Sequence, residues 1–257
     1  MINKSSFQKK LSHFDEAVTA KVYDKIMLAN KIFKPVFTNE FYPPGIWKAV
    51  YDLQSEFDVI VGYDGIFEDS ERRMLAFSQE LVEEYPIKLV KITNKSKFKE
   101  LSHRDYLGAI MSLGIVRDKV GDLILEDGNC YCVISEDVCD YILSNLNFIG
   151  KCPCVADVIS MEEDKLPKHN FETKEYIISS FRADCVVSSI CGLSRSNAVE
   201  LIKRGSVLKD YIEISQKDFP VEEDCTLTIK GYGKFKILNQ IGYTNKERVK
   251  ILVKKYI

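Results

Sequence analysis

The amino-acid sequence predicts an α+β protein with an N-terminal helical region, a central α/β domain with a mixed sheet and a small C-terminal domain. Three observations support this class. The first part of the chain has mainly helical patterning, short apolar segments typical of strands then alternate with helices, and two short helices near the C-terminus precede a strand. A chain of 257 residues with 46% apolar content can bury a core in each of two or three such domains.

The N-terminal region, residues 1–55, is expected to be helical. An amphipathic stretch covers residues 11–33, and a Tyr-Pro-Pro-Gly break at 42–45 separates it from a shorter helix at 46–53. The amphipathic pattern fits two arrangements equally well. These helices either pack on the central domain or form a protein-interaction module.

The central domain, residues 56–160, alternates expected strands and helices. In chain order these are a strand at 59–61, a helix at 70–84, a strand at 87–92, a helix at 102–114, paired strands at 122–125 and 131–134, a helix at 136–146 and a strand near 148–155. Ser102 with Asp105 three residues later is typical of a capping box at a helix start. The Asp-Gly-Asn triplet at 127–129 is a strong hairpin signal.

Residues 161–178 form the expected linker, because 161–170 has no apolar periodicity. The C-terminal domain, residues 179–257, begins with two short helices. The apolar stripe of the first is Ala183, Val186, Val187 and Ile190. Gly192 is expected to end this helix, Ser194 to cap the second, and Gly205 to end the second.

The second of these helices has a basic face. At about 100° per residue, Ser196, Lys203 and Arg204 lie opposite Leu201, with Arg195 at the edge. Residues 171–257 carry 15 basic and 11 acidic side chains, although the whole chain has a net charge of −2. A basic end on an acidic body favours a polyanionic partner, and the alternative is an ordinary solvated surface.

The same C-terminal segment resembles the alpha-L RNA-binding domain, first described in ribosomal protein S-four. The matching residues are Arg182 and Asp184, then Leu193, Ser194, Arg195, Ser196 and Ala198, then Leu201, Ile202, Gly205 and Val207. Two positions depart from the pattern: Ala183 replaces a usual leucine, and Asp210 stands where asparagine often ends the strand. The second change puts a negative charge near the expected binding face.

The resemblance extends to the bacterial YlmH-like proteins and covers about 58–257. Three further segments carry it: 102–125 (SHRDYLGAIMSLGIVRDKVGDLIL), Gly62-Tyr63 with Glu71-Arg72-Arg73, and the loop 231–235 (GYGKF). This resemblance implies a cytoplasmic, non-enzymatic protein that binds ribosomal RNA and the large ribosomal subunit. It also implies a role in rescue of stalled translation with transfer RNA as a possible further partner, and a weaker link to cell division.

The expected RNA contacts are basic side chains, which reach phosphates as charge-assisted donors, and two hydroxyls. They are Arg182, Ser194, Arg195, Ser196, Lys203, Arg204, Lys209, Lys230, Lys234 and Lys236. A second RNA surface is expected in the central domain at His103, Arg104, Arg117 and Lys119. Few aromatic residues interleave these charges, so we expect recognition of structured RNA by shape and phosphate contacts.

An alternative hypothesis makes the central domain an RNA-modifying enzyme that the C-terminal domain delivers to RNA. Its candidate groups are His103, Asp105 and Asp122, although helix capping explains the first two as well. The sequence has no nucleophile motif, and Gly-Tyr-Asp-Gly at 62–65 lacks the pattern of a dinucleotide or Walker loop. We therefore expect no catalytic residue and no cofactor.

Metal binding and membrane insertion are not expected either. Cys130 and Cys132 are separated by one residue, whereas paired zinc ligands usually have two or more between them. The eight cysteines, without a secretory signal, indicate reduced thiols in the cytoplasm. The sequence has no run of eighteen apolar residues, so no membrane span is predicted.

Overall fold

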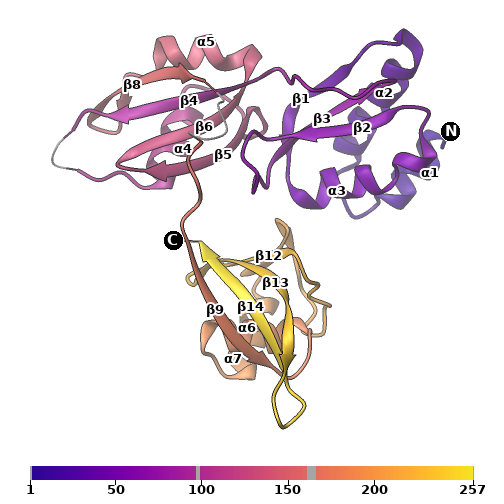
Figure 1. Cartoon of the computed structure of the whole chain (residues 1–257), viewed down its shortest axis with the longest axis vertical. Coiled ribbons are helices and arrows are strands. Elements are labelled where there is room, and N and C mark those ends of the chain that lie inside the picture. Colours follow the sequence, from indigo (N-terminus) through magenta and orange to yellow (C-terminus); the bar gives the residue numbers. More distant parts are fainter. Residues whose placement is uncertain (1, 97–98, 161–165, 257) are drawn as a thin grey trace. The chain divides into compact units, whose positions relative to one another are not determined.

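The computed structural model describes residues 2–96, 99–160 and 166–256, and it divides into two compact units, Met1–Lys168 and His169–Ile257 (Figure 1). Helices and antiparallel sheets occur in both units, which confirms the predicted α+β class. Among the described residues, no helix combines the length and the apolarity needed to cross a membrane.

The N-terminal part of the first unit packs three helices against a small antiparallel sheet. Its elements are α1 (Lys4–Lys10), α2 (Glu16–Ile32), β1 (Val36–Tyr42), α3 (Pro44–Asp52), the 3-10 turn η1 (Gln54–Glu56), β2 (Ile60–Asp64) and β3 (Arg73–Ser78), with strand order β1-β3-β2. Phe7, Ile26 and Phe77 lie in its core. The helices expected within 11–33 and at 46–53 are confirmed.

Two sequence predictions in this part are wrong. The segment 70–84 is not a helix, because it contains β3, and β1 lies in a region expected to be wholly helical. Met74 and Phe77 are fully buried in the middle strand of the sheet. A strand buried on both faces appears in the sequence as a continuous apolar run, which periodicity cannot distinguish from a buried helix.

The central part of the first unit is a five-stranded antiparallel sheet with two helices. Its elements are β4 (Ile87–Asn94), α4 (His103–Ser112), the 3-10 turn η2 (Arg117–Lys119), β5 (Val120–Glu126), β6 (Asn129–Ser135), α5 (Glu136–Asn145), β7 (Phe148–Ile149) and β8 (Cys152–Ile159), with strand order β5-β6-β4-β8-β7. All its strand pairs are antiparallel, whereas a mixed sheet was expected. The predicted helix at 136–146 is confirmed.

The two faces of this sheet have different neighbours. On one face Ile92 of β4 shares a core with Tyr106 of α4 and with residues of α5. On the other face Leu89 of β4 shares a core with Phe41 of β1 and Met74 of β3. Strands β1 and β3 therefore pack on the central sheet, whereas the N-terminal helices, among the described residues, pack on their own small sheet rather than on the central domain.

Two local predictions in this part are confirmed by the backbone. Asp105 accepts hydrogen bonds from the backbone N–H of Ser102 (2.8 Å) and from its hydroxyl (2.7 Å) at the start of α4. Asp127 (φ 50°) and Gly128 (φ 74°) form the two-residue turn between β5 and β6. Both residues of such a hairpin turn need positive φ, which aspartate and glycine adopt readily.

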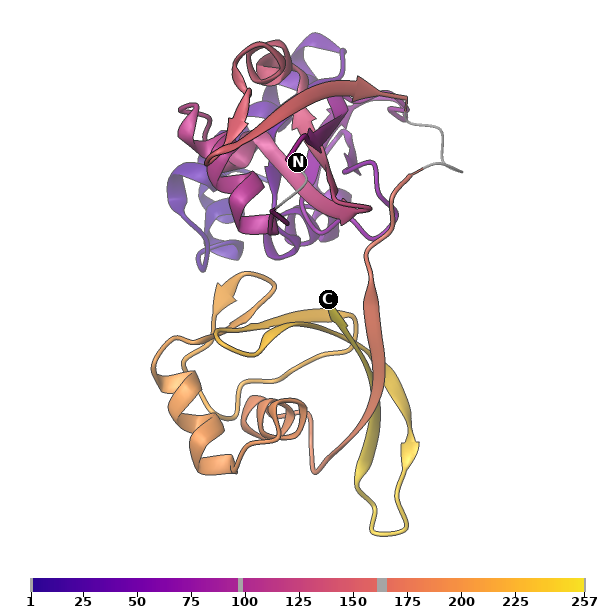
Figure 2. The same ribbon diagram turned by 90° about the vertical axis from the view of Figure 1, so that its left-hand side faces the viewer.

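The second unit packs two helices on one side of a six-stranded antiparallel sheet (Figure 2). Its elements are β9 (Phe171–Ile178), α6 (Ala183–Cys191), α7 (Arg195–Lys203), β10 (Val207–Lys209), β11 (Ile212–Glu213), β12 (Cys225–Ile229), β13 (Gly233–Tyr243) and β14 (Val249–Tyr256), with strand order β11-β10-β12-β13-β14-β9. Val187 of α6 and Ile202 of α7 share a core with Ile251 of β14.

The boundaries of the two helices agree with the sequence prediction. Gly192 ends α6 with φ 64°, and the hydroxyl of Ser194 accepts a hydrogen bond from the N–H of Asn197 (3.2 Å) at the start of α7. The expected linker at 161–178 is partly regular structure, because β9 pairs with β14 along its whole length. Residues 161–165 of that linker lie outside the described residues.

Candidate nucleic-acid interface

The carboxylate of Asp184, in the first turn of α6, holds two arginine side chains. It accepts from Arg182 Nε (3.1 Å) and Nη2 (3.3 Å), and from Arg195 Nη2 (2.7 Å). The Asp184 side chain is 4% exposed, whereas Arg182 and Arg195 are 40% and 58% exposed. Two positively charged groups that lie 13 residues apart in sequence are thus fixed to one buried acceptor at the surface.

The electrostatics of this cluster keep Asp184 ionised. Burial alone would raise the pKa of Asp184, but hydrogen bonds from Arg182 and Arg195 outweigh it and lower the pKa to about 2. The same hydrogen bonds raise the pKa of both arginines. The cluster therefore carries one net positive charge at neutral pH.

The start of α7 adds hydroxyl and backbone donors beside Arg195. Ser194 caps the helix, and its Oγ lies 2.9 Å from Ser196 Oγ, with both side chains exposed. The first N–H groups of a helix and its dipole favour an anion at this end. The fold thus brings Arg182 together with Arg195, Ser194 and Ser196. Spacing along α7 alone did not show this, because Arg182 lies at the start of α6.

A second basic group lies at the other end of α7. Lys203 is exposed and has no ion pair within the part of the chain that the structure describes. Arg204 pairs with Glu200 (3.1 Å) on the helix surface, and Lys230 Nζ donates to the carbonyl of Gly205 (3.0 Å). These cations lie about two turns from Arg195, because a helix rises about 1.5 Å per residue.

The remaining predicted contacts of the C-terminal unit are engaged within it. Lys209 pairs with Glu222 and is 15% exposed, and Lys236 pairs with Asp224 (3.1 Å). Lys234 donates to the hydroxyl of Tyr211 (2.9 Å) and also lies over the ring of Tyr256. These lysines are less available to phosphate than the cations on α7.

Asp210, the departure from the alpha-L pattern, has a structural role. It has φ 46°, and its Oδ1 accepts from the N–H of Thr226 (2.9 Å). Its own N–H donates to the carbonyl of the same residue (2.8 Å). The carboxylate thus ties the end of β10 to β12.

The four residues of the expected second surface differ in exposure and in partners. His103 and Arg104 are exposed in the first turn of α4. Arg117 donates to the carbonyls of Val120 and Gly121, while Lys119 pairs with Asp137 and donates to the carbonyl of Asn39 (2.9 Å). Arg117 therefore holds the start of β5, and Lys119 holds β1.

Asp122, a candidate acid or base in the enzyme hypothesis, forms a structural joint. It is 7% exposed, and its two carboxylate oxygens accept from the backbone N–H groups of Glu71 and Arg72. Arg72 in turn donates to the carbonyl of Phe41 (2.6 Å) and to Asp118 (2.7 Å). Two segments that carry the YlmH-like resemblance meet here, and the joint connects the N-terminal and central parts of the unit.

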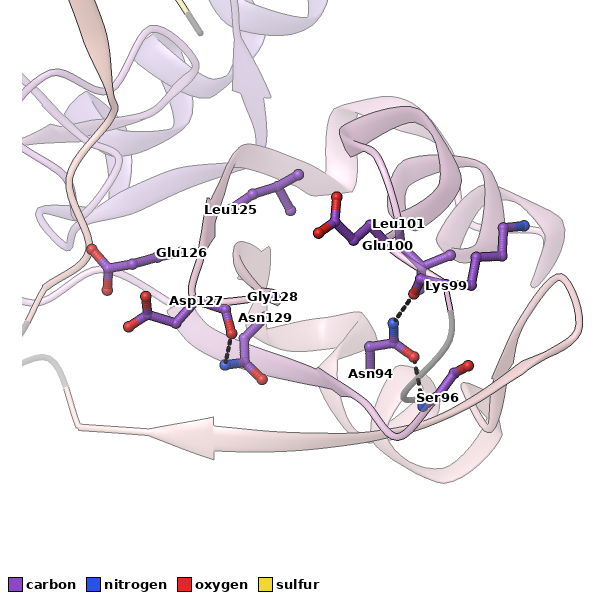
Figure 3. Close-up of a pocket in the computed structure, with 10 residues that line it drawn as sticks. All are labelled: Asn94, Ser96, Lys99, Glu100, Leu101, Leu125, Glu126, Asp127, Gly128 and Asn129. Carbon is purple, nitrogen blue, oxygen red and sulfur yellow. Dashed lines mark hydrogen bonds between the residues drawn. The ribbon is translucent and has the colours of Figure 1, made fainter.

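A groove in the central part lies between the β5–β6 turn and the segment before α4 (Figure 3). Asn94 fixes one wall, because its Nδ2 donates to the carbonyl of Lys99 (2.8 Å) and its Oδ1 accepts from Ser96 N–H (2.9 Å). The residues lining the groove are Asn94, Ser96, Lys99, Glu100, Leu101, Leu125, Glu126, Asp127, Gly128 and Asn129. Three carboxylates against one lysine disfavour phosphate in this groove.

The groove does not unite the groups of the enzyme hypothesis. Among the residues that the structure describes, its lining includes none of His103, Asp105 or Asp122. Asp105 is engaged in capping α4, and hydrogen bonds from Ser102 lower its pKa. His103, Asp105 and Asp122 thus do not line a common pocket among the described residues.

The cysteines of the central part are packed in its core. Cys130 and Cys132 of β6 are fully buried, and burial raises the pKa of both thiols. Within the described ranges, no group of three or more His, Cys, Asp or Glu side chains is arranged to hold a metal ion.

Comparison with known proteins relates the chain to one family. Residues 81–163, which contain the central sheet with α4 and α5, match the family model "Putative RNA-binding domain in YlmH". The "Ribosome-associated protein quality control protein P2" of Bacillus subtilis (strain 168) is 25% identical over 216 residues, covering 82% of this chain and 84% of that protein. A solved structure, "Cell division protein ylmH from Streptococcus pneumoniae", is 20% identical with a TM-score of 0.49, covering 60% of this chain and 98% of that one.

Proposed function

We propose that this chain, which resembles the YlmH-like RNA-binding proteins, is a non-enzymatic protein that binds structured RNA of the large ribosomal subunit. Its place of action is the cytoplasm, in rescue or quality control of stalled translation, with transfer RNA as a further contact. The name of the B. subtilis relative, which refers to ribosome-associated quality control, supports this assignment.

The Asp184 cluster is the observation that carries the proposal. Asp184 uses two N–H groups of Arg182 and one of Arg195. A guanidinium group has about five N–H donors, so both arginines retain donors for phosphate oxygens. Because the carboxylate fixes their orientation before RNA arrives, binding RNA requires less ordering of these long side chains.

The other proposed contacts extend the binding face around this cluster. Ser194, Ser196 and the N–H groups at the start of α7 lie beside Arg195, while Lys203, Arg204 and Lys230 lie at the far end of the helix. Lys209, Lys234 and Lys236 are secondary contacts, because each must leave or share a partner to reach phosphate. In the central part, His103 and Arg104 form the exposed portion of a second RNA surface.

We do not propose catalysis for the central part. The candidate groups of the enzyme hypothesis are divided between a helix cap, a structural joint and an exposed helix start, and none lines the groove. General acid–base chemistry needs such groups within hydrogen-bond reach of one substrate position.

Co-sedimentation with ribosomal subunits tests the proposal. The double variant Arg195→Glu/Lys203→Glu is compared with wild type at two salt concentrations. A matched control, Lys31→Glu/Lys34→Glu, makes the same change in charge on exposed residues at the end of α2.

Wild type and the control are expected to sediment with the large subunit, with weaker binding at higher salt because phosphate contacts release counterions. The Arg195/Lys203 variant is expected to stay at the top of the gradient. Binding of this variant equal to that of wild type would contradict an RNA contact through α7.

A further inference from the structure

The turn between β13 and β14 forms a basic, partly apolar pocket outside the α6–α7 face. In Figure 1 this turn extends past the ends of both helices of the unit. The residues lining the pocket are Ile177, Tyr243, Thr244, Asn245, Lys246, Arg248 and Lys250. The C-terminal end of the chain is basic, and none of the predicted RNA contacts lies in this turn.

The backbone of the turn is held by its own hydrogen bonds. Thr244 N–H donates to the carbonyl of Arg248 (2.8 Å), and Arg248 N–H donates to Thr244 Oγ1 (3.1 Å). Glu247 N–H donates to the carbonyl of Thr244 (2.9 Å). The side chains of the pocket therefore project from an ordered loop.

Two exposed side chains with large apolar surface line this pocket. Tyr243 is 63% exposed and Ile177 is 50% exposed. Ile177 of β9 pairs with Lys250 of β14, which pairs in turn with Gly242 of β13. Gly242 has no side chain, and a Cβ at its position would meet no atom within 4 Å, so the sheet face that carries Ile177 and Lys250 is open at this position.

The charged residues that line the pocket are all basic, while Glu247 of the same turn is not part of the lining. Lys246, Arg248 and Lys250 line it, and no ion pair joins any of them to another described residue. No carboxylate is part of the described lining. On the α7 and β12–β13 surfaces, by contrast, Arg204 and Lys236 each pair with a carboxylate.

We propose that this β13–β14 hairpin pocket binds an unpaired nucleotide of RNA, with the base stacked on Tyr243 and its neighbouring phosphates held by Lys246, Arg248 and Lys250. An exposed aromatic ring next to unpaired cations is the combination that single-stranded nucleic acid requires. The inference rests on the proposed function only in taking RNA as the ligand. It adds recognition of a single-stranded segment to phosphate contacts through α7.

Fluorescence anisotropy with the full chain tests this site. The probe is a labelled, unstructured RNA of about twelve nucleotides, and the reference ligand is a blunt duplex of the same sequence. The variants are Tyr243→Ala, Tyr243→Phe and, as a matched loss of an exposed tyrosine outside the pocket, Tyr141→Ala on α5. A polyglutamate peptide competes in a parallel series.

Tyr243→Ala is expected to weaken binding of the single strand by about 5- to 150-fold, the loss of one stacked base. Binding of the duplex should change less than about twofold. Tyr243→Phe should bind as wild type because the Phe ring still stacks. Tyr141→Ala should also bind as wild type because Tyr141 lies outside the pocket. Because Tyr243 is largely exposed, the variant is expected to keep the wild-type thermal transition.

Two results would overturn the inference. One is equal affinity of Tyr243→Ala and wild type for the single strand. The other is competition by polyglutamate as strong as that by RNA, which would assign the pocket to an acidic protein segment. Neither result depends on ribosome co-sedimentation of the Arg195/Lys203 variant, so failure of this site and failure of the proposed function are distinguishable.

Discussion

Replacing Asp184 with asparagine tests whether RNA affinity depends on the fixed orientation of Arg182 and Arg195 or only on net charge. Asparagine has one acceptor oxygen and no charge, so it cannot keep all three hydrogen bonds from Arg182 and Arg195, and its NH₂ group faces a guanidinium. The change also removes a negative charge from a surface that we propose to bind RNA. If net charge alone set affinity, RNA binding would strengthen, whereas loss of the brace should weaken it.

The effect on stability follows from the pKa of Asp184, which falls from 3.8 to about 2 in the folded protein. A shift of this size corresponds to about 2 kcal/mol, and solvent screening of the part-exposed arginines reduces it to about 1–2 kcal/mol. Because the folded pKa is the lower one, this stabilisation is present above about pH 4 and is lost as pH falls toward 2. The asparagine variant should lack this pH dependence.

Hydrogen exchange provides the assay for the second unit, with ribosome co-sedimentation as the second measurement and urea unfolding of the first unit as a control. The single tryptophan, Trp47, lies in the first unit, so its fluorescence should show the same midpoint in wild type and Asp184→Asn. Hydrogen exchange of amides in α6 should be faster in the variant. Asp218→Asn is the matched control, because Asp218 is exposed near Arg182.

Three outcomes would refute this reasoning. Stronger ribosome binding by Asp184→Asn would show that charge outweighs bracing. Unchanged exchange in α6 would show that the ion pairs do not stabilise the second unit. Equal loss of binding in Asp218→Asn would show that the effect is not specific to the shared carboxylate.

Two further predictions concern the first unit. Asp122→Ala leaves two buried backbone N–H groups without their acceptor, so we expect the free energy of unfolding to fall by about 1–3 kcal/mol per group left unpaired. Trp47 Nε1 donates to the carbonyl of Glu71, so tryptophan fluorescence in urea should detect this loss, and an unchanged midpoint would argue against the joint. Cys130 and Cys132 should react with a thiol reagent at neutral pH only after unfolding, because burial removes access and raises the pKa of both thiols; rapid labelling of either in the native protein would contradict their packing.

Sequence reasoning was sufficient for the features that depend on a few neighbouring residues. The Ser102–Asp105 cap, the Asp127-Gly128 turn and the helix end at Gly192 each follow from side-chain or backbone chemistry within one turn of the chain. The α+β class and the basic face of α7 follow from periodicity over longer segments. The resemblance to YlmH-like proteins followed from short motifs in the same order.

Features that join distant segments depend on how the whole chain folds. β1 and β3 are strands because each buries its residues against partners remote in sequence, a burial that local patterning does not encode. Asp184 unites Arg182 with Arg195, and Glu222 neutralises Lys209, because chain topology sets which charges meet. Whether a basic residue remains available to RNA therefore depends on its folded neighbours, and the sequence names only the candidates.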